Sequence, residues 1–213
     1  MTRNELVTLI AARFNYRSDL ESKIIAELKN AQLELEEELI SDPPWFLLSE
    51  VAETTGQVGK ERLPLPDDFL LEYDEGTLWV YDITETDDPW IELKKGRHDK
   101  LKEEYVGTGR PIRYAIVGEY FRVFPTPDKA YVYRMLYYKR QEVLDTNIEN
   151  NWLKYSPWLI GGKAGFNLAH NLEHERNQAF FEGKYTESYL SLEKKARARE
   201  EANMEESMDD MEP

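Results

Sequence analysis

Cysteine is absent from this chain of 213 residues. Its absence excludes disulfide bonds, thiolate nucleophiles and zinc or iron–sulfur centres that cysteine would hold. A chain without thiols also suits a reducing cytoplasm.

Basic residues are scarce relative to acidic ones, with 27 Lys and Arg against 42 Asp and Glu and a formal net charge of −15. Such a chain should repel both the phosphate backbone of nucleic acids and an anionic membrane surface. The composition therefore argues against a protein that wraps DNA or RNA or that lies on a membrane.

Long apolar runs are missing as well. The longest, such as residues 45–48, are far shorter than the ~20 apolar residues that a membrane-spanning helix needs. No secretory signal is visible at the start of the chain, so we expect a protein made and used without export. Hydrophobic residues still make up 41% of the sequence, which is enough for one domain or two small ones.

The first 42 residues show two runs of apolar residues at helical spacing. The first run predicts a short helix whose buried face consists of Leu6, Leu9, Ile10 and Phe14. A capping box at residues 18–21 then predicts the start of a helix of about 24 residues. Its apolar face comprises Leu20, Ile24, Leu28, Ala31, Leu35 and Leu39, and its solvated face includes the run Glu36, Glu37 and Glu38. Pro43 and Pro44 end this helix.

The middle of the chain is rich in β signals. Residues 69–73 and 77–83 flank Asp74-Glu75-Gly76, which predicts a hairpin. Residues 95–105 are a short polar helix candidate. Residues 114–117, 120–124 and 130–138 predict a three-stranded meander with tyrosine-rich alternation in its last strand.

Helices return after Asn150. Ser156-Pro157 predicts a helix start, and Gly183 predicts a break before a final helix with Tyr185, Tyr189, Leu192 and Ala196 on one face. Residues 200–213 hold seven acids and no base. Because these acids repel one another in a free helix, we expect disorder there without a partner.

Three features could be mistaken for a catalytic or metal site. His170 and His174 frame an H-x-x-E-H pattern, which on one helix would place two zinc ligands four residues apart. No cysteine and few residues remain to supply a third ligand, so we predict no metal there. The glycines at 107–109 and 161–163 match no phosphate-binding loop. Abundant carboxylates leave open an acid/base pair for glycoside hydrolysis.

Short motifs stand between the predicted elements in a characteristic order. They are PWFLL at 44–48, LPLPDDF at 63–69, GRPIRYAI at 109–116, FRVFPTPD at 121–128, NWL at 151–153 and PWLI at 157–160. Together with the two N-terminal helices, they resemble the head-to-tail adaptor proteins of tailed bacteriophages, particularly short-tailed ones. The resemblance spans about residues 4 to 196.

The resemblance implies an α+β, mainly helical fold, in which N- and C-terminal helices form one bundle with an inserted antiparallel β module. The boundaries that we predict are 1–44 and 146–199 for the bundle helices, 45–145 for the module and 200–213 for the acidic tail. The same apolar stripes favour packing of these distant helices on each other.

The resemblance also implies a function without catalysis, cofactor or metal. The family forms rings, usually of twelve copies, under the portal of the virion, extends the DNA channel and attaches tail or nozzle proteins during genome packaging and ejection. DNA would pass through the lumen without specific binding, and no membrane is involved. Assembly would take place in the cytoplasm of the bacterial host.

The C-terminal segment is the predicted partner-binding region, a docking arm for a neighbouring virion protein such as the portal. Its residues are Lys194, Lys195, Arg197, Arg199, Met204, Met208 and Met211. The methionines recur at spacings of 4 and 3, which places them on one helical stripe. Two other functions stay open at this point: a hydrolase of a carbohydrate polymer such as cell wall, and a cytoplasmic assembly partner.

Overall fold

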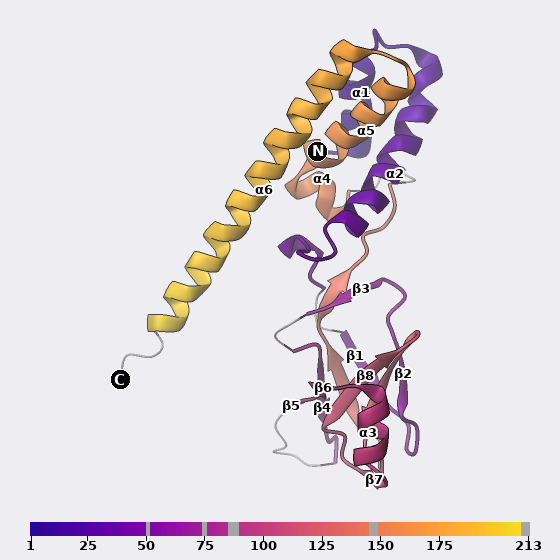
Figure 1. Cartoon of the computed structure of the whole chain (residues 1–213), viewed down its shortest axis with the longest axis vertical. Coiled ribbons are helices and arrows are strands. Elements are labelled where there is room, and N and C mark those ends of the chain that lie inside the picture. Colours follow the sequence, from indigo (N-terminus) through magenta and orange to yellow (C-terminus); the bar gives the residue numbers. More distant parts are fainter. Residues whose placement is uncertain (50–51, 74–75, 85–89, 145–148, 210–213) are drawn as a thin grey trace. The chain divides into compact units, whose positions relative to one another are not determined.

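The computed structural model describes residues 1–49, 52–73, 76–84, 90–144 and 149–209, without the side chains of residues 200 and 203–209. It confirms the predicted α+β class (Figure 1). The chain divides into two compact units, which we call the helical unit (Met1–Leu47 and Gln141–Pro213) and the β module (Leu48–Arg140).

The helical unit is built on one central helix. Its elements are α1 (Arg3–Arg13), η1 (Ser18–Leu20), α2 (Glu21–Glu38), η2 (Trp45–Leu47), α4 (Asn151–Tyr155), α5 (Pro157–Asn171) and α6 (Glu175–Asp209). Helix α5 packs against both α2 and α6 and runs between them (Figure 1). Most of the predicted stripe is buried, with Ile24, Leu28, Ala31 and Leu35 in the core. The predicted length of about 24 residues is wrong, since α2 has 18; Leu20 lies in η1, and Leu39 follows the helix and is half-buried.

Two details of the N-terminal helices were predicted wrongly. The capping box belongs to α1, where Thr2 and Glu5 form two reciprocal hydrogen bonds. The Thr2 hydroxyl accepts one from the Glu5 backbone amide, and the Glu5 carboxylate accepts the other from the Thr2 backbone amide. Residues 18–20 form a 3₁₀ turn instead, because Asp19 pairs with Arg17 at 2.7 Å and Leu20 is buried. Leu9 is exposed and lines a surface hollow with Trp158 and Phe180.

The predicted helix break at Gly183 is also wrong. The chain turns at residues 172–174, where Glu173 adopts a positive φ of 53°, and Gly183 lies inside the continuous helix α6. The backbone remains helical through Asp209, so the expected disorder of the acidic segment is wrong for residues 200–209. Extending an existing helix needs no new nucleus, which lowers the cost of adding these residues. The last four residues lie outside the described residues.

Glycines on α5 allow the close approach of its neighbours. A Cβ at Gly162 would lie 2.7 Å from the Tyr185 backbone nitrogen, and one at Gly165 would lie 2.4 Å from the Phe181 ring. A Cβ at Gly161 would lie 2.7 Å from Leu6. Gly161 and Gly162, one of the two glycine stretches considered for phosphate binding, therefore serve helix packing. Lys163, which follows them, binds Glu38 at 2.5 Å and Glu34 at 3.3 Å on α2.

The β module contains two four-stranded sheets with the strand orders β1-β11-β4-β5 and β2-β9-β8-β6. Two short pairs, β12-β3 and β10-β7, accompany them. The strands are β1 (Ala52–Thr55), β2 (Arg62–Pro64), β3 (Phe69–Glu72), β4 (Leu78–Tyr81), β5 (Ile91–Glu92), β6 (Lys94–Lys95), β7 (Thr108–Gly109), β8 (Arg113–Val117), β9 (Tyr120–Phe124), β10 (Thr126–Pro127), β11 (Val132–Met135) and β12 (Tyr137–Lys139). The sheets share a core that includes Leu63, Val80, Phe121, Val123 and Tyr133.

The strand pairing differs from the prediction, although most strand positions agree. Strands β3 and β4 do not form a hairpin, since β3 pairs with β12 and β4 with β11 and β5. The turn residues Asp74 and Glu75 lie outside the described residues. Strands β8 and β9 pair as predicted, but the third strand of the meander divides at Leu136 into β11 and β12 and joins other strands. The polar helix is confirmed as α3 (His98–Glu104).

Candidate functional site

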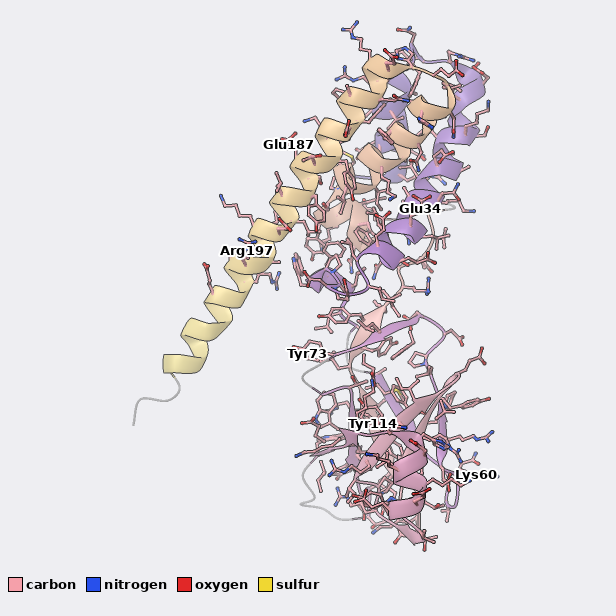
Figure 2. All side chains as sticks on the ribbon, in the orientation of Figure 1. Glu34, Lys60, Tyr73, Tyr114, Glu187 and Arg197 are labelled. Carbon is pink, nitrogen blue, oxygen red and sulfur yellow. The ribbon has the colours of Figure 1, made fainter. Side chains whose placement is uncertain are left out.

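Helix α6 contains the four cations of the predicted docking arm, Lys194, Lys195, Arg197 and Arg199. Its 35 residues span about 50 Å. Lys194 and Arg197 are exposed, and Figure 2 shows Arg197 on α6. Lys195 Nζ lies 3.5 Å from the carbonyl oxygen of Tyr155, and the guanidinium of Arg199 lies 3.9 Å from the ring centre of Trp45. Two of the four cations are therefore held by the helical unit itself.

An aromatic cluster forms the surface on which Arg199 rests. The rings of Trp45 and Tyr155 lie 4.5 Å apart in an edge-to-face arrangement. Phe46 stacks on Tyr155 at 5.5 Å and meets the buried Trp152 at 5.1 Å. Such edge-to-face and stacked pairs stabilise the cluster beyond the area that they bury. The cluster fixes the position of the basic segment of α6.

The methionine part of the predicted docking arm is described only in part. Met204 and Met208 belong to α6, but their side chains are not among those that the structure describes, and Met211 lies outside the described residues. The prediction of a methionine stripe assumes a helix, and the backbone at residues 204 and 208 is helical.

Glu36 lies at the centre of a buried polar network that sequence reasoning missed. The residue is only 1% exposed, although the run of glutamates predicted a solvated face. Its Oε1 accepts hydrogen bonds from Gln32 Nε2 at 3.2 Å, the Gln141 amide at 3.2 Å and Trp152 Nε1 at 3.3 Å. Asn150 Nδ2 donates to Gln32 Oε1 at 3.1 Å. The network joins α2 to the chain that returns from the β module.

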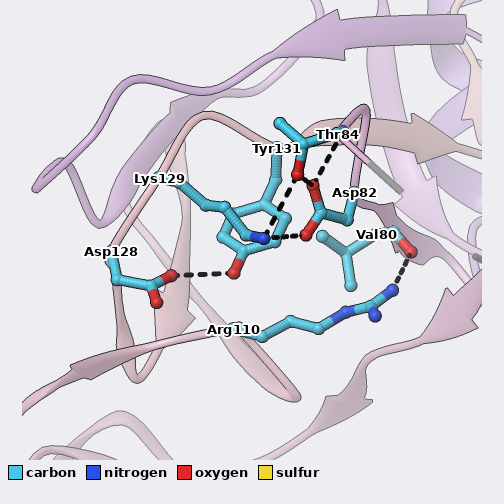
Figure 3. A network of polar contacts seen from close by, with 7 residues as sticks. All are labelled: Val80, Asp82, Thr84, Arg110, Asp128, Lys129 and Tyr131. Atoms are coloured by element: carbon cyan, nitrogen blue, oxygen red, sulfur yellow. Dashed lines mark hydrogen bonds and ion pairs between the residues drawn. The ribbon is translucent and has the colours of Figure 1, made fainter.

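A second polar network lies in the β module (Figure 3). Asp82, which is 2% exposed, forms an ion pair with Lys129 and accepts hydrogen bonds from the hydroxyl and amide of Thr84 at 2.7 and 2.9 Å. The hydrogen bond from the Lys129 ammonium lowers the pKa of Asp82, and burial raises it. Together with the hydrogen bonds from Thr84, the ammonium outweighs burial, so the pKa falls to about 2. Tyr131 donates to Asp128 at 2.7 Å, and burial raises the pKa of its phenol. These contacts hold the end of β4 to the segment that precedes β11.

The two histidines of the H-x-x-E-H pattern do not share a helix. His170 is in α5, while His174 lies in the turn before α6 and meets the ring of Phe14 at 5.9 Å. His170 Nδ1 is 3.2 Å from the amide nitrogen of Gln178. Within the described ranges no three histidine or carboxylate side chains are grouped as a metal would require.

The described helices also contain none that is long and apolar enough to cross a membrane.

A comparison with known protein families identifies one family over nearly the whole chain. The sequence model of the SU10 adaptor protein family matches residues 1–209, so the chain belongs to that family and is a structural adaptor of a bacteriophage. The resemblance to phage head-to-tail adaptors is thereby confirmed. A search of curated proteins found no significant match to this chain.

Proposed function

We propose that this adaptor forms a ring of twelve copies under the portal, extends the DNA channel and provides the attachment site for the tail. The observation that carries the proposal is the family match over residues 1–209, which covers both the helical unit and the β module. Its work is done by contacts between subunits and with portal and tail proteins, without catalysis, cofactor or metal.

Charge supports the proposed channel. With a net charge of −15, the chain exerts a repulsive field on a passing duplex. A wall that repels DNA lets it slide, whereas a basic wall would hold it by phosphate contacts. The protein would be assembled in the cytoplasm of the bacterial host and remain in the virion at the junction of head and tail.

The C-terminal part of α6 is the proposed docking arm for the portal. Lys195 and Arg199 fix its base on Tyr155 and Trp45, while the exposed Lys194 and Arg197 face outward. The acids and methionines beyond Arg199 would bind a basic groove with an apolar floor. A chain truncated after Arg199 should keep its melting temperature but lose salt-sensitive binding to portal. Full affinity of this variant at low and high salt would rule out the docking arm.

The function is tested with phage particles made without this protein. The proposal predicts DNA-filled heads without attached tails, and recovery of tailed, infectious particles when the purified full chain is added. A chain with Arg176→Glu, an exposed position on α6 outside the docking arm, serves as the control and should restore tails equally. Normally tailed particles in the absence of the protein would contradict the proposal.

A further inference from the structure

The sheet formed by β2, β9 and β8 has one face in the core and one face outside. Leu63, Phe121 and Val123 point into the core. Because side chains alternate along each strand, Arg62, Val117, Tyr120 and Arg122 share the opposite face. Helix α3 covers part of this face through Leu101, which packs with Ala115 and Phe124. The uncovered part forms a hollow of about 250 Å³.

This hollow contains an arginine that forms no ion pair with a described residue. Arg62 and Arg122 are directly opposite each other on β2 and β9, an arrangement that is unfavourable for like charges. Arg122 is neutralised by Glu61 at 2.7 Å. Arg62 forms no ion pair with any residue that the structure describes, and its guanidinium lies 5.8 Å from the Tyr120 ring centre. Glu119 lines the hollow too but pairs with neither arginine.

The same hollow has apolar walls. Val117 is 38% and Tyr120 is 40% exposed. An arginine without a partner beside exposed apolar side chains fits a ligand that combines a carboxylate with aliphatic groups. We call these four residues, Arg62, Val117, Tyr120 and Arg122, the hollow face.

The end of α2 offers that combination. Leu33 and Glu37 are four residues apart on its outer side, and Ile40 follows in the turn after the helix. Leu33 is 39% and Ile40 is 41% exposed. Glu37 is exposed and has no ion pair within the described part of the chain, whereas the neighbouring Glu34 and Glu38 bind Lys163. We call Leu33, Glu37 and Ile40 the α2 ridge.

We infer that the hollow face of one copy binds the α2 ridge of a second copy, with Glu37 paired to Arg62 and an aliphatic side chain in the hollow. The inference rests on the proposed ring. Each copy carries both complementary surfaces. A contact of two different surfaces repeats head to tail and gives a ring where the rotation between copies closes, as the proposed ring requires. DNA phosphate matches the arginines but not the apolar walls, and the net charge of −15 opposes its approach.

Charge reversal tests the pairing on the full chain, alone and with portal. Arg62→Glu and Glu37→Arg should each weaken association between copies by about tenfold or more, and the double variant should recover most of it. Arg176→Glu and Glu182→Arg, exposed on α6, are the matched controls and should assemble like the wild type. Melting temperatures would show that the variants fold.

Cross-linking gives a second readout because the chain has no cysteine of its own. Copies with Glu119→Cys, which lines the hollow, and copies with Ser41→Cys, next to Ile40 of the α2 ridge, are mixed, assembled and oxidised, so that Arg62 and Glu37 stay in place. A disulfide-linked dimer should form in the mixture and not with either variant alone, and copies with both cysteines should form a ladder ending at the ring size.

The outcomes separate this inference from the proposed function. If the wild type assembles and the charge variants assemble equally, or if the mixture gives no cross-link, the inference is wrong and the ring stands. If Arg62→Glu abolishes salt-dependent binding of a short DNA duplex but leaves assembly unchanged, the hollow face serves DNA and the inference is again wrong. A wild type that forms no ring alone or with portal overturns the proposed function, and the inference with it.

Discussion

Glu36 accepts a hydrogen bond from the indole nitrogen of Trp152 at 3.3 Å, although 116 residues separate them along the chain. The same carboxylate oxygen accepts a hydrogen bond from the backbone amide of Gln141, the first residue after the β module. One buried acid on α2 thereby fixes both the return of the chain and the start of the C-terminal helices. This residue therefore joins the N-terminal and C-terminal parts of the helical unit.

Removing this acceptor should be costly. Glu36→Ala leaves two buried donors, the Trp152 indole and the Gln141 backbone amide, without the acceptor that they have in the structure. Gln32 keeps the carbonyl oxygens of Gln141 and Glu142 as acceptors. We therefore expect a loss of about 3 kcal/mol in the free energy of unfolding. Glu36→Gln keeps an acceptor oxygen and should lose less. Urea unfolding measures both, with the exposed Glu37→Ala as the control. Equal stabilities of Glu36→Ala and Glu37→Ala would contradict the structural role of the network.

Replacing either of two glycines in the C-terminal helices by alanine should change the stability of the protein, in opposite directions for the two positions. Gly162→Ala places a methyl group 2.7 Å from the backbone of Tyr185, which cannot rotate away, so we expect a loss of about 1–3 kcal/mol. Gly183 has nothing within 4 Å, and Gly183→Ala should add up to about 1 kcal/mol by favouring the helix. Thermal unfolding of both variants decides this, and stabilisation by Gly162→Ala would disprove the tight packing of α5 on α6.

Asp82 should govern part of the acid sensitivity of the β module. Its pKa is lowered from 3.8 to about 2 by Lys129 and Thr84, so its contribution to stability is complete above about pH 4 and is lost as the pH falls toward 2. Asp82→Asn should be less stable at pH 6 and equal to the wild type near pH 2. Unfolding measured between pH 2 and 6 tests this, with the exposed Asp67→Asn as the control. Parallel curves for wild type and Asp82→Asn across that range would refute it.

The sequence predicts elements better than it predicts their partners. The stripe of Ile24, Leu28 and Leu35 defines α2 because a helix buries one face whatever packs against it. Strand pairing depends on which distant strand completes the sheet, and so β3 pairs with β12 rather than with its neighbour in sequence. Local turn signals carry no information about that choice.

The misassigned residues are those whose role depends on tertiary contacts. Glu36 looks like its neighbours Glu37 and Glu38, and only the arrival of Trp152 and Gln141 makes it a buried acceptor. Gly183 carries a break signal but lies in open space on a helix whose packing is fixed elsewhere. The sequence places the cations 194–199 on a helix, but it could not predict the contact of Arg199 with Trp45, because those residues are far apart in sequence.

The central claim, a ring that joins the portal to the tail, is tested most directly by the mass of the particle in solution. Light scattering of the purified chain, alone and mixed with portal, should give a species of about 300 kDa, or a portal complex heavier by that amount, for twelve copies of a 25.1 kDa chain. A mass that stays at 25.1 kDa for the chain alone, with no gain in the mass of the portal, would contradict the account.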